Sequence, residues 1–159
     1  MIKHLVMDVD GVLNTGHFFY SAEGKMFKAF GPHDKDGIKI AQKLGLTIDF
    51  ITADSNGWEI TCARLIKDWG FTNSNVHLVT EGDRLDWIEK QYNLKEVAYI
   101  GDGIHDAPIL AKVAIGIAPR GARREAIAAA EYVTESDAGS GAVLDAVLIV
   151  QGIMKNENL

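Results

Sequence analysis

VMDVDGVLN, residues 6–14, joins the end of an apolar segment to two acidic residues and a glycine. The mostly apolar residues 2–7 predict a β-strand that ends close to Asp8. Side chains two residues apart on a strand point the same way, so we expect Asp8 and Asp10 to do so while the strand lasts. Gly11 permits a sharp turn or a close approach to the backbone. Two adjacent like charges need a compensating partner, and a divalent cation or a phosphoryl group would meet that need.

The bulk composition is that of an ordinary globular protein. The chain has 159 residues, of which 47% are hydrophobic and 24% are charged, so we expect a single domain over residues 1–159. A net charge of −6 argues against nucleic acid or an anionic membrane as the main partner. No apolar run approaches the roughly 20 residues of a membrane span, and Asp8 and Asp10 interrupt any signal-peptide core. We therefore expect a cytoplasmic protein.

Strand-like and helix-like segments alternate along the chain. Short apolar strands are predicted over residues 2–7, 47–51, 76–79, 97–100, 114–117 and 131–134, and helices over residues 34–44, 58–69, 83–92, 106–112, 123–130 and 141–154. Residues 17–20 and 25–30 flank the turn 21–24 and predict a β-hairpin. Alternation of this kind is typical of an α/β fold, a three-layer sandwich with a central, mostly parallel sheet, here with a small hairpin insertion.

Reactive residue types recur where the predicted strands end. Asp8 and Asp10 follow the first strand, Thr52 follows the second parallel strand, and Asp102 follows a later one. In parallel sheets, ligands bind beyond the carboxyl ends of the strands. We therefore expect these residues to share one site.

The residue types in this set suit phosphoryl transfer. Asp8 is the candidate nucleophile, which would form an aspartyl-phosphate. Asp10 is the candidate general acid for the leaving alcohol and general base for the water that follows. Mg²⁺ prefers hard oxygen ligands, and the Asp8 carboxylate, the Asp10 backbone carbonyl and the Asp102 carboxylate would supply them.

Other residues near the strand ends are candidates for phosphate binding. The Thr52 hydroxyl can donate to a phosphate oxygen, and Ala53 follows it directly. Arg84 can balance the charge of the transition state, and such electrostatic positioning is often the largest single term in catalysis. Asp106 can order metal-bound water or fix the loop after Asp102.

These motifs resemble, in order, the four motifs of the haloacid dehalogenase superfamily. They are DVDGV at 8–12, IT at 51–52, Arg84, and GDGIHD at 101–106, and they span most of the chain. More narrowly, the chain resembles the small cap-less branch typified by the 3-deoxy-D-manno-octulosonate 8-phosphate phosphatases. The hairpin and four further segments carry this likeness: SAEG at 21–24, VAYIGD at 97–102, EYVT at 131–134 and GSGAV at 139–143.

The resemblance implies a specific activity and assembly. It implies Mg²⁺-dependent hydrolysis of a sugar phosphate. It also implies a homotetramer in which a neighbouring subunit covers the open site, because the branch has no cap domain.

The chain departs from the family pattern at positions that bear on substrate choice. The third motif usually carries Lys where this chain has Arg84, which keeps the charge and adds a bidentate fork. The octulosonate enzymes typically have Gly-Arg where this chain has Ala53 and Asp54. An acid at this position is closer to phosphatases of nine-carbon 2-keto-3-deoxy sugar acids. Asp54 is therefore a candidate substrate-binding residue, as are Arg64 and Lys67 on the following helix.

Two other functions remain open at this point. One is a phosphatase for a different phosphorylated metabolite, which the Ala53-Asp54 pair leaves possible. The other is a catalytically silent domain used for oligomerisation, such as those attached to sugar cytidylyltransferases. The retained acids Asp8, Asp10 and Asp102 argue against a silent domain, because a scaffold has no need for clustered unpaired carboxylates.

Overall fold

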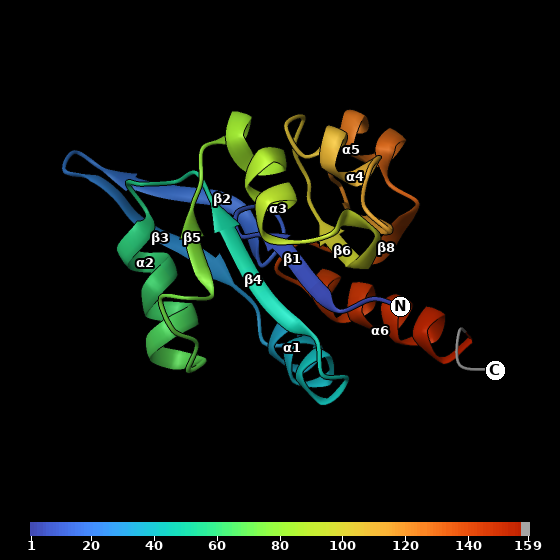
Figure 1. Cartoon of the computed structure of the whole chain (residues 1–159). Coiled ribbons are helices and arrows are strands. Elements are labelled where there is room, and N and C mark those ends of the chain that lie inside the picture. The colour runs from blue at the N-terminus through green and yellow to red at the C-terminus, as the bar shows by residue number, and fades with distance from the viewer. Residues whose placement is uncertain (157–159) are drawn as a thin grey trace.

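A six-stranded parallel sheet forms the centre of the molecule, in the order β5-β4-β1-β6-β7-β8 (Figure 1). The structure is a computed structural model and describes residues 1–156. Every neighbouring pair in this sheet is parallel. The strands are β1 (His4–Asp8), β4 (Thr47–Thr52), β5 (Val76–Leu78), β6 (Val97–Ile100), β7 (Ile115–Arg120) and β8 (Tyr132–Asp137). The predicted parallel sheet is confirmed.

Helices cover both faces of the sheet. Figure 1 shows α1 (Asp34–Lys43) and α6 (Ala142–Asn156) beneath it, and α3 (Arg84–Gln91), α4 (Ala107–Leu110) and α5 (Arg124–Ala129) above it. On the α1 side, α2 (Trp58–Cys62) continues into a π-helix, η1 (Ala63–Asp68), and the 3₁₀ turns η2 (Glu81–Asp83) and η3 (Leu94–Glu96) precede α3 and β6. The three-layer sandwich is confirmed. The helix expected over 106–112 is shorter than predicted. At its C-terminal end the Lys112 amide donates to the Ile109 carbonyl, three residues earlier, which is the pattern of a 3₁₀ turn and not of an α-helix.

The central strand β1 divides the core into two layers. Leu5 and Met7 pack with α1 and α6, whereas Val6 packs with α3, α4 and α5. This is the period-two alternation of a strand that is buried on both faces. The α1–α6 contact is close at Gly37, where a Cβ atom would lie 2.7 Å from the Leu144 Cα.

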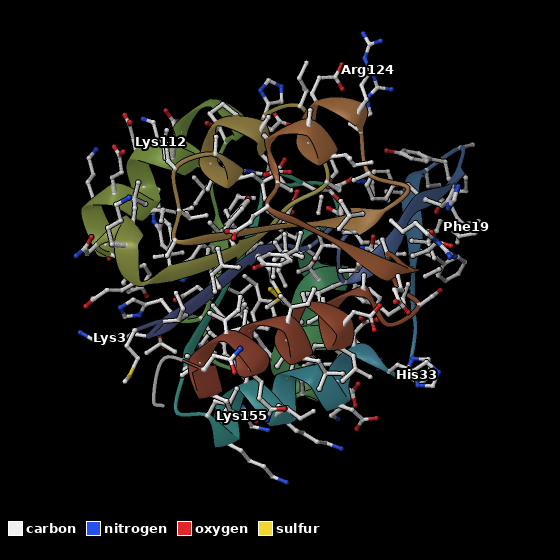
Figure 2. The ribbon with its side chains drawn as sticks, turned by 90° about the vertical axis from the view of Figure 1, so that its right-hand side faces the viewer. Lys3, Phe19, His33, Lys112, Arg124 and Lys155 are labelled. Carbon is white, nitrogen blue, oxygen red and sulfur yellow. The ribbon has the colours of Figure 1, made fainter. Side chains whose placement is uncertain are left out.

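A two-stranded antiparallel hairpin, β2 (Asn14–Ser21) and β3 (Gly24–Phe30), projects away from the sandwich (Figure 1). It begins earlier than predicted, because Asn14 pairs with Phe30 and extends the ladder toward the sheet. Phe19, Tyr20 and Phe27 are more than half exposed along it, and Figure 2 shows Phe19 at the outer edge of the molecule. Within residues 1–156 no segment forms a separate cap domain, and no described helix is long and apolar enough to cross a membrane.

Candidate active site

Three neighbouring strands bring the predicted site residues together at one edge of the sheet. In the order β4-β1-β6, Thr52 ends β4, Asp8 ends β1, and Asp102 lies just beyond the end of β6. Because these strands run parallel, their carboxyl ends meet at the same edge. The tertiary structure thus groups residues that are far apart in sequence.

Asp8 lies at the centre of the group and is buried, with 6% of its surface exposed. Its Oδ2 accepts a hydrogen bond of 2.8 Å from Arg84 Nη1, and its Oδ1 accepts one of 3.3 Å from Arg84 Nη2. Arg84 opens α3 and is buried as well. Burial, followed by the charge of Asp106, raises the pKa of Asp8 well above its usual value, and Arg84 opposes this shift. The two-pronged contact matches the planar fork of the guanidinium.

Asp106 anchors the loop after β6. Its Oδ1 accepts from Arg84 Nη1 at 2.8 Å and from the Tyr99 hydroxyl at 2.6 Å. Its Oδ2 accepts from the backbone amides of Asp102 at 3.1 Å and Gly103 at 2.8 Å. Four donors thus engage this carboxylate, which favours its predicted role of fixing the loop. Sequence reasoning missed Tyr99, whose polar hydroxyl in an otherwise apolar strand was the available signal.

Asp102 faces the other two acids without an ion-pair partner among residues 1–156. Oxygens of Asp8, Asp102 and Asp106 lie within 4.8 Å of one another. Burial, followed by the charge of Asp106, raises the pKa of Asp102 to about 7. A cation between these carboxylates would relieve the repulsion, and hard oxygen donors fit Mg²⁺. Gly11 has φ +81°, and a Cβ atom there would collide with the Asp102 carboxylate, so this turn requires glycine.

The Asp10 side chain has a different set of partners from Asp8. β1 ends at Asp8, so the two-residue period of a strand does not extend to Asp10. Its Oδ1 accepts from Asn14 Nδ2 at 2.8 Å, and its Oδ2 accepts from the Thr52 hydroxyl at 3.3 Å. Lys28 Nζ lies 2.8 Å from Oδ1 and 3.1 Å from Oδ2. The Asp10 carboxylate is therefore held between the hairpin and the end of β4.

Two hairpin lysines complete the site, and sequence reasoning missed both. The side chain of Lys28 is 0% exposed and its Nζ lies 2.9 Å from Asp54 Oδ2 and 3.0 Å from Thr61 Oγ1. Lys25 Nζ lies 2.5 Å from the same Asp54 oxygen. A lysine amid the apolar run of β3 was a local signal for Lys28. The partners of both lysines come from another part of the chain, which no local pattern reveals.

A cavity of about 380 Å³ opens in front of Asp8. It is lined by predicted site residues, by two residues of the hairpin and by Glu81 of η2: Asp8, Asp10, Phe18, Lys25, Ala53, Asp54, Glu81 and Arg84. Its volume is in the range of small-molecule sites. A larger cavity of about 510 Å³ lies beside Asp102 and Arg120 but does not reach Asp8. The smaller cavity is the candidate active site, because Asp8, the candidate nucleophile, and its partner Arg84 both line it.

Five predicted residues do not line this cavity. Asp102 and Asp106 belong to the acid group beside Asp8, and Asp102 lines the larger cavity instead. Thr52 is buried behind the smaller cavity, and its Oγ1 accepts from the Asp54 amide at 3.1 Å. Arg64 donates to the Gly31 carbonyl at 3.0 Å and pairs with Asp68. Lys67 is exposed on η1. Neither basic residue of that helix therefore contacts the cavity within this chain.

Comparisons with known proteins agree with this geometry. The family of haloacid dehalogenase-like hydrolases matches residues 86–147. The 3-deoxy-D-manno-octulosonate 8-phosphate phosphatase KdsC of Salmonella typhi is 34% identical over 160 residues, which cover 95% of this chain and 81% of the relative.

Solved structures share the fold as well. The Moraxella catarrhalis 3-deoxy-D-manno-octulosonate 8-phosphate phosphatase, in complex with a magnesium ion, a phosphate ion and a KDO molecule, is 25% identical with a TM-score of 0.80, over 95% of this chain and 86% of that one. The cobalt-bound phosphatase of Haemophilus influenzae is 28% identical with a TM-score of 0.78, over 94% and 88%.

Proposed function

The chain belongs to the haloacid dehalogenase superfamily, and from this premise we propose that it is a Mg²⁺-dependent phosphatase acting on a 2-keto-3-deoxy sugar acid phosphate. Its relatives are phosphatases, named for an octulosonate 8-phosphate. The observation that carries the proposal is the buried Asp8 carboxylate, which faces a cavity, is paired with Arg84 and lies beside Asp102. A solvent-exposed carboxylate without a catalytic role would not require burial, an arginine partner and a neighbouring acid.

In the first half-reaction, an Asp8 carboxylate oxygen attacks phosphorus and forms an aspartyl-phosphate. The bond between phosphorus and the leaving oxygen breaks, and Asp10 donates its proton to that oxygen. Arg84 binds the developing negative charge on the phosphoryl oxygens, because its guanidinium already lies against Asp8. Thr52 holds Asp10 through its hydroxyl.

In the second half-reaction, a water molecule attacks the phosphorus of the aspartyl-phosphate. Asp10, now deprotonated, accepts the proton of that water. The bond between phosphorus and the Asp8 oxygen breaks, which releases inorganic phosphate and restores the Asp8 carboxylate. Asp10 returns to its protonated state and the cycle is complete. Lys28 and Asn14 keep its carboxylate in place through both halves.

Mg²⁺ is the cofactor that fits this acid group, in line with the magnesium ion in the Moraxella structure. Asp8 and Asp102 would hold it, with the Asp10 backbone carbonyl as the third predicted ligand. When bound, Mg²⁺ neutralises negative charge so that one anion can approach another. Asp106 supports this site from behind, because its oxygens are engaged by four protein donors.

We also propose a homotetramer in which neighbouring subunits cover the open side of the cavity. The support is the apolar hairpin, where Phe19, Tyr20, Met26 and Phe27 are 47–65% exposed. Exposed apolar clusters of this kind mark interaction sites. The rival function of a silent oligomerisation domain would use the same surface, but it gives no reason for the buried acids around Asp8.

The test is phosphate release by the purified protein with Mg²⁺, using an aryl phosphate and a panel of sugar and sugar-acid phosphates. We expect turnover in the wild type and a loss of about 10³-fold or more in Asp8→Asn, which removes the nucleophile. Asp36→Asn is the matched control, since Asp36 is an exposed acid on α1.

Two outcomes would contradict the proposal. One is a wild type that is inert toward every phosphate ester in the panel, and the other is an Asp8→Asn variant that retains full activity. Orthovanadate with Mg²⁺ separates the enzyme from a silent scaffold, because binding of this phosphate mimic to the folded state raises the melting temperature. A ranked substrate panel separates sugar acids from other phosphorylated metabolites.

A further inference from the structure

Two hairpin side chains, Phe18 of β2 and Lys25 of β3, reach from outside the sandwich into the wall of the active-site cavity. The Lys25 side chain is only 4% exposed. Its Nζ lies 3.7 Å from the centre of the Phe18 ring, a cation–π distance. An aromatic face holds an ammonium group without neutralising its charge. The hairpin thus carries a buried positive charge to the substrate cavity.

Lys25 shares its acidic partner, Asp54, with Lys28, which also pairs with Asp10. Asp54 Oδ2 lies 2.5 Å from Lys25 Nζ and 2.9 Å from Lys28 Nζ, so one carboxylate oxygen serves two ammonium groups. Burial alone would raise the pKa of Asp54, but the hydrogen bonds from Lys25 and Lys28 outweigh it and lower that pKa. Lys28 lies behind the wall, whereas Lys25 lines the cavity. The Lys25 end of the cavity therefore presents an ammonium group that shares its carboxylate partner with Lys28.

The other groups on the wall give a second anion no alternative partner. Arg84 is the other basic residue lining the cavity within the described chain, and it is already paired with Asp8 and Asp106. Glu81 also lines the wall and would repel a second anion. Among the described side chains of this chain that line the cavity, Lys25 is thus the basic group left for a second negative charge on the substrate.

We propose that Lys25 binds a carboxylate on the leaving group of the substrate and so selects sugar-acid phosphates over neutral sugar phosphates. This inference rests on the proposed function and deepens it. Phe18 acts as a positioning residue, whose ring holds the ammonium group at the wall, whereas Asp54 competes with the substrate carboxylate for that group. The proposal assigns a specificity role to the hairpin beyond any role in assembly.

The test compares matched acyclic substrates that differ only at the end distal to the phosphate. Each pair consists of an aldonic acid phosphate and the alditol phosphate of the same length, with chains of six to nine carbons. For at least one length we expect the wild type to favour the acid by about tenfold or more in kcat/KM, the effect of one charge-assisted hydrogen bond. Lys25→Met should bring the ratio close to one, and Lys25→Arg should retain most of it.

A substitution at Asp54 should raise the ratio of kcat/KM for the acid to kcat/KM for the alditol, whereas Lys25→Met should lower it. Asp54→Asn keeps a side-chain oxygen for the Gly57 amide bond but removes the charge that competes for Lys25, so the preference for acids should rise. Lys112→Met is the control, because Lys112 forms a solvent-exposed pair with Glu89 and lies on the opposite side of the molecule from Phe19 in Figure 2. Its ratio should equal that of the wild type.

The outcomes separate this inference from the proposed function. If the wild type hydrolyses the aryl phosphate but shows no acid preference at any length, the Lys25 proposal is wrong and the phosphatase proposal stands. The same holds if Lys25→Met and Lys112→Met give the same ratio. A wild type inert toward every phosphate ester contradicts the phosphatase proposal itself. Thermal unfolding of each variant confirms that the compared proteins are folded.

Discussion

At the scale of single residues, the site depends on carboxylates that burial makes difficult to ionise. Asp102 is the clearest case, because burial and then the neighbouring Asp106 raise its pKa from 3.8 to about 7. Between these pH values the folded chain retains a proton that the unfolded chain has released. The stability contribution of this group is therefore present at low pH and is lost as the pH rises through about 7. Mg²⁺ must compete with that same proton.

We expect Mg²⁺ to stabilise the protein more at pH 8 than at pH 6. At the higher pH Asp102 is ionised and can bind the cation, whereas at the lower pH a proton must first leave. The measurement is the melting temperature with and without Mg²⁺ at both pH values. Asp102→Asn serves as the control, and its Mg²⁺-dependent shift should be small at both. An equal shift at the two pH values in the wild type would contradict the expectation.

At the scale of elements, the α1–α6 contact determines how closely two helices pack beneath the sheet. Gly37 lies in α1, and a Cβ atom there would meet the α6 backbone, at 2.7 Å from Leu144 Cα and 2.9 Å from Leu144 N. At the same junction Asp34 accepts a 3.0 Å hydrogen bond from the Val143 amide, which satisfies a donor at the start of α6. The missing side chain at Gly37 and the hydrogen bond accepted by Asp34 thus allow α6 to pack closely against α1.

Two glycine substitutions in helices should have opposite effects on stability. Gly152→Ala, in α6 with no atom within 4 Å of the added Cβ, should stabilise the fold by about 0.5–1 kcal/mol through helix propensity. Gly37→Ala has the same propensity gain but forces α1 away from α6, so we expect a net loss of about 1–3 kcal/mol. Urea unfolding measures both. Equal stabilisation by the two substitutions would show that the contact tolerates a methyl group.

At the scale of the whole molecule, the hairpin is the feature that the sandwich does not explain. It stands away from the sheet and exposes aromatic side chains, including Phe19 at the molecular edge in Figure 2. Its inner residues Phe18, Lys25 and Lys28 instead contribute to the cavity and to the Asp10 support. The hairpin therefore has an inner side that contributes residues to the site and an outer side that is suited to contact with other subunits.

The proposed tetramer should depend on the outer side of the hairpin. We expect Tyr20→Lys combined with Phe27→Lys to reduce the assembly to monomers, because the added charges would be buried without partners. Sedimentation velocity at micromolar concentration measures the state. Leu148→Lys, which replaces another exposed apolar residue on α6, is the control and should remain tetrameric. A monomeric wild type, or a charged variant that stays tetrameric, would contradict this assembly.

Local patterns in the sequence were sufficient for most of the fold. Apolar periodicity depends on neighbours within a few residues, so the strands ending at Asp8, Thr52 and Ile100 were predicted within a residue or two. The parallel sheet followed from their alternation with helices. The shortness of α4 and the π-helix after Cys62 were not predicted, because hydrogen-bond geometry within one helical turn leaves little trace in composition.

The sequence by itself determined the parallel sheet, the order of strands and helices along the chain, and the placement of acids at strand ends, because these depend on short-range periodicity. Only the tertiary structure decided which charges meet. Arg84 joins both Asp8 and Asp106, and Lys25 shares Asp54 with Lys28 across the hairpin. Such pairs bring together segments that are distant along the chain. Their distances follow from how the sandwich and the hairpin pack, a property that no local pattern encodes.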